Sequence, residues 1–484
     1  MLGQLATAAL LLCGVLGLGL RGVTAADRRL ALPAATRAAL VLLVGIAVLG
    51  VSTFVLGQFG QLGAWWPVVF ALAGGTAWLR RPVRAAGLDL AGRLGRTWRT
   101  HPWLASAFAL TLAVGALGAL APPSHVDEVE YHWPAAEIWA TFHGWVPVNL
   151  RHVNAFPFME VVYTAAATQG SYVAAHLLHF ATLVALALVA AGLARSLGLS
   201  GGLEVAVAAV AMRVVWDFAA SAYNDTAVGA FLVAAVAVAV GGRFERRALV
   251  GASLMLVVAT SIKPTAAVAT GLLVLALVLA RLDPELAPPQ DGAVSRWRGI
   301  PSSIALLAGP VLATVVFWSV RQHAYTGWWI DPFLVAPPDE YVRTTLPTTA
   351  EQVVAPVMPF VLGVVGSPEP WGGRTSAVLQ VLLLPALVYV LVYRGRVARR
   401  FALLALPAWA NWVVLGLFIV RTRFHIVSWV LLVVACRVVL EDAARRWPAW
   451  SGRLEAVWSV LLAVGMVDVG VSSVRAVAPL FAGS

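Results

Sequence analysis

A short polar segment interrupts a chain that is otherwise mostly apolar. Of the 484 residues, 60% are hydrophobic and 12% are charged, yet residues 122–134 (PPSHVDEVEYHWP) hold five ionisable side chains, His125, Asp127, Glu128, Glu130 and His132. A carboxylate that is partly desolvated at a membrane boundary has a raised pKa and can act as a general base. We therefore expect Asp127 to be catalytic, with Glu128 beside it.

Two other interpretations of the acidic pair stay open. Ser124 stands in an N-cap position, so Asp127 and Glu128 could simply complement the positive end of a helix. Together with His125 they could also bind a divalent metal ion, because imidazole and carboxylate ligands suit Mg²⁺, Mn²⁺ or Zn²⁺. No zinc-ligand spacing is matched in the sequence, so a metal cofactor is an alternative and not the main expectation.

Other polar residues stand near the ends of apolar segments. Asn224 and Asp225 lie in SAYNDTA, where Asp225 is either a helix cap or a site residue. Lys263, the one lysine of the chain, lies in TSIKPTA. In a chain that otherwise uses arginine, a single lysine indicates either a required compact ammonium group or an accident of composition.

Arginines near the same ends are candidate phosphate ligands. Arg421 and Arg423 lie in VRTRFHIV, and Arg321 begins the segment that leads to YTGWWIDPF. Because guanidinium groups match phosphate oxygens, these arginines and Lys263 are expected to form a cationic pocket at the bilayer surface. The alternative is that the arginines only reach toward lipid headgroups.

The elements that carry these residues are predicted to be membrane helices, because apolar segments close to the ~20 residues needed to cross a bilayer recur along the chain. The fourteen candidate spans are 3–20, 38–57, 62–79, 103–121, 171–194, 203–220, 226–241, 248–262, 264–280, 303–320, 375–393, 401–420, 424–440 and 453–473. Pro264 either separates two of these helices or kinks one. The predicted fold is an all-α, polytopic integral membrane protein with about 11–14 transmembrane helices.

Arginine-rich loops alternate along this arrangement, and the positive-inside rule places them in the cytoplasm. The long segments 122–170 and 321–374 then face outward, at a plasma (inner) membrane, and helices at 127–142 and 157–168 are expected to lie along the membrane. The net charge of +11 is explained by these loops, so no nucleic-acid partner is expected. The sequence also contains no phosphate-binding loop typical of nucleotide-driven transport.

Taken in order, these motifs resemble those of GT-C glycosyltransferases that use polyprenyl-phosphate sugars. The similar group includes bacterial protein O-mannosyltransferases and lipid A aminoarabinose transferases. The resemblance covers residues 103 to about 430. It rests on five motifs in the same order: VDEVEYHWPAAEIW; Asn224 with Asp225; KPTA, which begins at Lys263; Thr326 and Gly327 followed by Pro332 and Phe333; and Arg423 with Phe424. The chain departs from the group in having three additional spans, 3–20, 38–57 and 62–79, before the one at 103–121 that leads into the acidic loop, and in showing no appended soluble domain.

The resemblance implies three regions: accessory membrane helices (1–100), a GT-C-like core with its external loop (101–330), and a second external loop with the C-terminal helices (331–484). It implies inverting transfer of a sugar from polyprenyl phosphate to a hydroxyl of a lipid, glycan or protein acceptor on the extracytoplasmic side. The implied roles are Asp127 as base, Glu128 as acceptor-orienting group, Lys263, Arg421, Arg423 and Arg321 as donor phosphate ligands, and Asp225, Asn224, His132 and Tyr131 as positioning residues. The alternatives are a lipid or glycan transporter or flippase, and a glycan polymerase or ligase of another class.

Overall fold

The computed structural model describes residues 1–27, 32–148, 156–283, 300–327, 376–417 and 422–477, together with residues 30, 153, 154, 286 and 329. Every regular element in these ranges is helical. The first helices are α1 (Leu2–Asp27), α2 (Ala34–Gln58), α3 (Trp66–Leu79), α4 (Arg81–Thr100) and α5 (Pro102–Gly118). A π-helical turn, η1 (Glu128–His132), then leads into α6 (Trp133–Thr141), which α7 (Phe158–Ala167) follows.

The central helices are α8 (Tyr172–Ser196), α9 (Gly202–Val210), α10 (Arg213–Trp216), α11 (Asp225–Gly241), α12 (Arg246–Ile262), α13 (Ala266–Leu282) and α15 (Ile300–Thr326). The C-terminal part contains α20 (Ala377–Val392), α21 (Arg396–Gly416), the 3₁₀ turn η2 (Thr422–His425), α22 (Ile426–Arg446), the 3₁₀ turn η3 (Pro448–Trp450) and α23 (Ser451–Val477).

Within the described ranges the prediction of an all-α fold is confirmed, and the long apolar helices are consistent with a membrane protein. Among the described residues, six helices are long and apolar enough to cross a membrane, at Leu2–Ala26, Ala34–Gln58, Tyr172–Ser196, Ile300–Thr326, Arg423–Arg446 and Pro448–Val471. Several other predicted spans form shorter apolar helices, among them α3, α5, α11, α13 and α20. The count of 11–14 membrane crossings stays a prediction, because the shorter helices fall below the usual spanning length.

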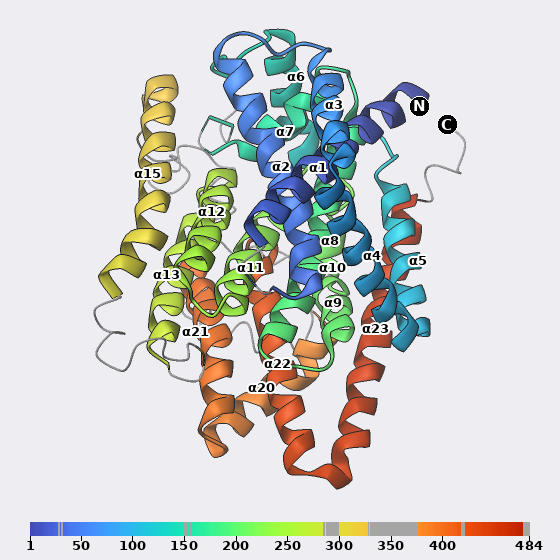
Figure 1. The fold of residues 1–484 in the computed structure, drawn as a ribbon, viewed down its shortest axis with the longest axis vertical. Helices are drawn as coiled ribbons and strands as arrows, with labels where there is room; N and C mark the ends of the chain where they lie inside the picture. The colour runs from blue at the N-terminus through green and yellow to red at the C-terminus, as the bar shows by residue number, and fades with distance from the viewer. Residues whose placement is uncertain are drawn as a thin grey trace.

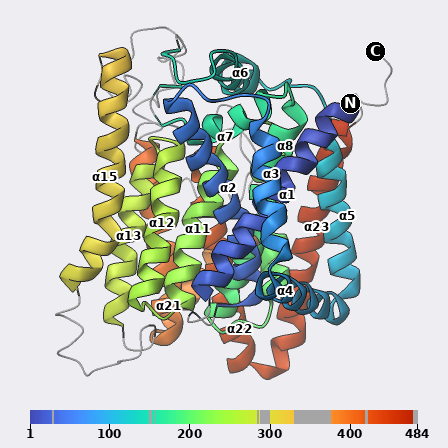
Figure 2. The ribbon, with the colours of Figure 1, turned by 45° about the horizontal axis from the view of Figure 1, so that its top comes forward.

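The helices form one bundle around a buried centre (Figures 1 and 2). α8 packs against α2 and α11, and α11 packs against α12 and α22. Most side chains of α8, α11 and α22 are buried, which is why α8 and α11 are largely apolar on all sides and α22 is largely apolar as far as Cys436. α6 and α7 lie at one end of the bundle in both views, and α15 stands at one edge.

The predicted span 203–220 is wrong, because the helix ends within it. α9 stops at Val210, Met212 has an extended backbone, and only the short α10 precedes the non-helical run to Asn224. Arg213 and Asp217 pair at 3.2 Å in this stretch. A charged pair and a broken backbone do not suit a spanning helix, and the break leaves residues 217–224 as a loop that reaches the site described below.

The two predicted spans around Pro264 are separate helices, α12 and α13, which pack against each other. Lys263 lies between them in an extended conformation, with φ −158° and ψ 136°. A residue that precedes proline avoids the helical region, so the sequence itself ends α12 at this point. The lysine is thereby held outside both helices.

The predicted surface helices of the first loop exist, but they are more buried than expected. η1 and α6 together span residues 128–141, with Trp139 fully buried and Val129 46% exposed. α7 matches the predicted helix 157–168, yet nearly all of its side chains are buried. It packs against α2, α6 and α8, so it belongs to the bundle and does not lie along its surface.

The Arg-rich segment after α3 was predicted to be a loop, and it is instead the helix α4. Most of its side chains are exposed, and it contacts α1, α2 and α3. Pro82 stands in its first turn, where proline favours a helix start.

Candidate active site

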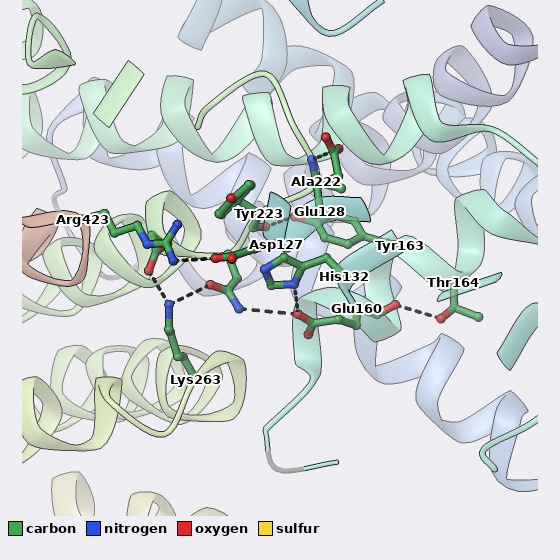
Figure 3. Close-up of polar contacts among 12 residues, drawn as sticks. Asp127, Glu128, His132, Glu160, Tyr163, Thr164, Ala222, Tyr223, Lys263 and Arg423 are labelled. Carbon is green, nitrogen blue, oxygen red and sulfur yellow. Dashed lines mark hydrogen bonds and ion pairs between the residues drawn. The ribbon is translucent and has the colours of Figure 1, made fainter. Parts of the chain in front are cut away.

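Four charged side chains from distant parts of the chain meet at one point (Figure 3). Arg423 Nη2 donates a 2.5 Å hydrogen bond to Asp127 Oδ2, and Arg423 Nε lies 3.7 Å from Asp225 Oδ2. Lys263 Nζ donates a 2.7 Å hydrogen bond to Asp225 Oδ1. We call Asp127, Asp225, Lys263 and Arg423 the charged cluster, and its two cations and two anions balance.

Each member of the charged cluster stands where a helix starts or ends. Asp127 immediately precedes η1, Asp225 is the first residue of α11, and Arg423 lies in η2 just before α22. The side chains at these helix ends meet at a common centre. Lys263 reaches the same centre from the junction of α12 and α13.

The cap alternative for Asp225 is wrong, because Asn224 occupies the N-cap position of α11 and Asp225 is its first helical residue. The alternative that Asp127 and Glu128 complement the positive end of a helix stays open. Asp127 occupies the N-cap position of η1 and makes no side-chain cap hydrogen bond. Asn224, the N-cap residue of α11, makes none either. Asp225 follows it in the first turn and uses both carboxylate oxygens on the cations of the cluster.

The pKa of Asp127 differs from the expectation of a raised value. Burial pushes this pKa upward, but the positive charges of Arg423 and Lys263 outweigh it and hold the pKa below the usual range of an aspartic acid. With the site in this state Asp127 is therefore ionised and paired. A carboxylate in that condition becomes an effective base only when its cationic partner is drawn away.

Aromatic rings surround the cations. The guanidinium of Arg423 lies 5.3 Å from the ring centres of Phe218, Tyr223 and Phe424, and Lys263 Nζ lies 3.8 Å from that of Phe424. Ring faces attract cations and exclude water from them. The charges of the cluster consequently act at lower dielectric than they would at an exposed surface.

Two polar atoms of the charged cluster have unused hydrogen-bonding capacity. Asp225 Oδ2 and Arg423 Nε are buried without a hydrogen-bond partner. Buried polar atoms are normally satisfied, and exceptions are often found where a ligand or an ion binds. The two atoms lie 3.7 Å apart, so a small shift of either side chain, or an oxygen that displaces Asp225, would complete the hydrogen bonding of Arg423 Nε.

A narrow crevice with an internal volume of about 10 Å³, room for about one water molecule, leads away from the charged cluster. Asp225, Lys263 and Arg423 line its polar part, and the remaining lining comes from α11, α13 and α22, with Val228, Leu232, Ala269, Ile426 and Val427 among it. One end of the crevice is cationic and the rest is apolar. The chemistry of this lining matches an anionic head group attached to a hydrocarbon chain, and α11, α13 and α22 must move apart to admit a ligand of that size.

A buried polar network extends from the cluster in another direction. Lys263 Nζ lies 3.4 Å from Asn224 Oδ1, and Asn224 Nδ2 lies 3.5 Å from Glu160 Oε1. The same Glu160 oxygen is 2.5 Å from His132 Nδ1. Asn224 and His132, both predicted to be site residues, are therefore linked through Glu160, which the sequence did not indicate because it is a single acid within the apolar helix α7.

Glu128 faces away from its neighbour Asp127 (Figure 3). Its Oε1 lies 2.5 Å from His176 Nε2 and accepts a 2.7 Å hydrogen bond from the Ala222 amide, while Oε2 accepts one of 3.2 Å from the Ser124 amide. Burial opposes ionisation, but the His176 and backbone hydrogen bonds prevail and lower the pKa of Glu128 to about 2. Like Glu160, His176 was missed because it lies within an apolar span.

The separation of the two acids bears on the metal hypothesis. Asp127 is bound by Arg423 and Glu128 by His176, so the two carboxylates address different partners. His125 packs its ring against Phe218 and Tyr223 at 5.7 and 5.8 Å. Within the described residues no group of three or more His, Cys, Asp or Glu side chains is arranged to hold a metal ion. The proposed metal ligands do not fit that role in this geometry.

The remaining predicted residues fall in three places. Tyr131 packs its ring 4.2 Å from that of His132, beside the charged cluster. Arg321 is bound elsewhere: its Nη1 donates to the Asn154 carbonyl, and its guanidinium lies 4.4 Å from the Tyr325 ring. Arg421 and most of the second long segment, 330–375, lie outside the described residues.

Comparisons with known proteins identify no relative: no family model, curated protein or solved structure matches the chain. The functional conclusion below therefore depends on the residues and geometry of the site.

Proposed function

We propose that this protein is a membrane glycosyltransferase that moves a sugar from a polyprenyl-phosphate donor to an acceptor hydroxyl, on the extracytoplasmic side of the plasma (inner) membrane. One observation carries the proposal: the acid and the two cations expected from the sequence, Asp127, Lys263 and Arg423, belong to one partly buried cluster. The resemblance to GT-C enzymes assigns base and phosphate ligands to these same residues.

The crevice supports a lipid-linked donor. Its cationic end offers Lys263 and Arg423 to phosphate oxygens, and its apolar walls suit an isoprenoid chain. A nucleotide sugar would leave those apolar walls in contact with a polar ligand. A prenyl phosphate matches both parts of the lining, and the crevice must widen to admit it.

In the proposed reaction, the acceptor oxygen attacks the anomeric carbon of the sugar as Asp127 removes the hydroxyl proton. A carbon–oxygen bond forms to the acceptor, and the bond between the anomeric carbon and the phosphate oxygen breaks. Its electron pair leaves with the phosphate, whose negative charge Lys263 and Arg423 stabilise. The products are a glycosylated acceptor and polyprenyl phosphate, with inverted configuration at the anomeric carbon, and Asp127 later loses its proton to water.

Donor binding would also activate the base. A phosphate that engages Arg423 competes with Asp127 for the guanidinium and adds negative charge nearby. Both effects raise the pKa of Asp127 from its lowered value and free its oxygen for the acceptor proton. The enzyme would thus be a poor base until the donor is in place, which limits wasteful donor hydrolysis.

The direct test is transfer in proteoliposomes that contain the purified protein, a radiolabelled polyprenyl-phosphate sugar and a mixture of lipid and glycan acceptors. We expect labelled, inverted product together with free polyprenyl phosphate. A transporter would instead move intact labelled donor into the protected lumen without cleavage. Intact donor on both sides and no released polyprenyl phosphate would contradict the proposal.

A further inference from the structure

A buried histidine–glutamate pair, which the proposed reaction does not use, lies beside the charged cluster. His132 Nδ1 is 2.5 Å from Glu160 Oε1, and the two side chains are 1% and 4% exposed. Glu160 is the one charged residue of α7, and its Oε2 has no hydrogen-bond partner among the residues that the structure describes. A buried carboxylate is energetically costly unless it has a polar partner. His132 is therefore the main partner of Glu160.

The π-helical turn η1 directs His132 toward Asp127. In this turn the Trp133 amide donates to the Glu128 carbonyl, five residues earlier. A π turn pairs residues that are five apart, as Asp127 and His132 are, whereas neighbours on an α-helix face are three or four apart. Figure 3 shows the His132 ring between Asp127 and Glu160, with one ring nitrogen turned to Glu160 and the other toward Asp127.

The charge of His132 also acts on Asp127. Burial raises the pKa of Asp127, whereas the positive charges of Arg423 and Lys263 lower it. His132 is the next contributor in the lowering direction. The imidazole and the carboxylate are therefore electrostatically coupled, as their positions in Figure 3 indicate.

The hydrogen bond to Glu160 fixes the tautomer of His132. A carboxylate accepts hydrogen bonds, so the proton of the neutral imidazole lies on Nδ1. Nε2 is then the basic nitrogen, and it makes no hydrogen bond to any residue that the structure describes. When Nε2 takes up a proton, the Glu160 carboxylate stabilises the positive charge of the ring. A histidine held by a carboxylate is a common arrangement for removing a proton from a hydroxyl group.

The titratable groups that face His132 come from several elements. They are Asp127, Tyr131 of η1, Glu160 of α7, His179 of α8 and Tyr223 of the segment 217–224. The rings of Tyr131 and Tyr223 lie 4.2 and 5.3 Å from the imidazole and shield it from water. The two carboxylates in this set have complementary positions, because Asp127 can deliver a proton and Glu160 can stabilise it.

We infer that His132 receives the proton that Asp127 takes from the acceptor hydroxyl, and that Glu160 positions His132 for this step. The inference rests on the proposed function, because it supplies the route by which Asp127 loses its proton. The proton moves from the acceptor oxygen to Asp127 and then to Nε2 of His132, directly or through one water molecule, and passes to water after the product leaves. No other bond changes in this step. Because an imidazole is a stronger base than a carboxylate, the second transfer draws the first one forward.

Two variants of similar shape separate this role from a structural one. His132→Asn keeps an amide N–H for Glu160 but has no basic nitrogen, and Glu160→Gln keeps an oxygen for Nδ1 of His132 but has no charge. Each should lower the rates of transfer and of donor hydrolysis by about 10²-fold, a typical contribution of general base catalysis, while the donor KM stays within about threefold of wild type. His101→Gln, at a partly exposed histidine before α5, is the control and should keep the wild-type rates.

Sodium azide distinguishes a lost base from a damaged site. Azide carries no proton, so its attack on the anomeric carbon forms a glycosyl azide and releases polyprenyl phosphate without a base. In the proteoliposome assay both variants should form glycosyl azide at a rate within about threefold of wild type, although they hydrolyse the donor slowly. Donor hydrolysis at the wild-type rate, or equal loss of the azide and water reactions, would overturn the inference. Absence of polyprenyl phosphate release by the wild-type protein with every acceptor would instead overturn the proposed function itself.

Discussion

Arg423 donates a 2.5 Å hydrogen bond from Nη2 to Asp127 Oδ2, although 296 residues separate the two in the sequence. The same guanidinium lies 3.7 Å from Asp225, so one arginine connects the loop after α5 with the start of α11. Arg423, the proposed ligand of the donor phosphate, therefore contacts the proposed base Asp127 directly. The predictions below follow from this connection and from the partners of Glu128.

Removing the charge of Arg423 should change the pH dependence of catalysis. The pKa of Asp127 is lowered chiefly by Arg423 against the opposing effect of burial, so Arg423→Gln should raise it. The acidic limb of kcat/KM, which reports the free enzyme, should move to higher pH. Arg446→Gln, which removes an arginine paired with Asp442, is the control and should leave the limb in place.

Lys263 should contribute mainly to donor affinity. Its ammonium group is the compact cation at the polar end of the crevice, so Lys263→Ala should weaken binding of a polyprenyl phosphate by about 10- to 100-fold, the equivalent of the ~1.5–3 kcal/mol of a hydrogen bond to a charged group. The measurement is competition by polyprenyl phosphate in the transfer assay. Arg453→Ala, at an exposed arginine of α23, is the control, and equal inhibition constants in the two variants would exclude Lys263 from the phosphate site.

Glu128 should stabilise the fold in a pH-dependent way. Its pKa falls from 4.5 to about 2 on folding, so its contribution is fully present above pH 4.5 and is lost as the pH falls toward 2. The shift corresponds to about 3 kcal/mol. Glu128→Gln should therefore lower the Tm by several degrees at pH 7, and the difference from wild type should shrink as the pH is lowered through 4.5.

A thiol-reactive dye can follow this unfolding, because Cys436 is buried and becomes accessible only when the bundle opens. A Cys13→Ser background removes the exposed thiol that would react at once. Glu137→Gln alters an exposed acid on α6 and is the matched control. If both glutamine variants had the same Tm at pH 7, the buried contacts of Glu128 with His176 and Ala222 would contribute no net stability.

The sequence predicts the helices of this protein well because long apolar segments leave few other folds in a membrane. The sequence-based prediction is wrong at residues 203–220. The segment is mostly apolar, yet its helix is interrupted at Met212, and Arg213 and Asp217 form an ion pair there. The prediction also misses α4, whose arginines suggested a loop. Composition identifies a helix in lipid, whereas the points at which helices break depend on packing with neighbours.

The sequence predicts which residues form the candidate site, but it does not predict which of them are in contact. Asp127, Asp225, Lys263 and Arg423 each stand out as polar residues at the end of an apolar segment, yet no spacing rule could show that they touch. Glu160 and His176 lie inside apolar helices and are the closest polar partners of His132 and Glu128. Burying an acid or an imidazole without a polar partner is energetically unfavourable. Such a residue inside an apolar helix therefore itself predicts a polar partner on a neighbouring helix.

The most direct test of the central claim separates donor binding from donor turnover in Asp127→Asn. This variant keeps the shape of the side chain and the cationic crevice but removes the proton acceptor, so donor affinity should stay within about threefold of wild type while transfer falls by about 10²–10⁴-fold. Glu130→Gln, at an exposed acid three residues away, should retain full activity. Transfer by Asp127→Asn at a rate close to that of the wild-type protein would contradict the role of Asp127 as the base.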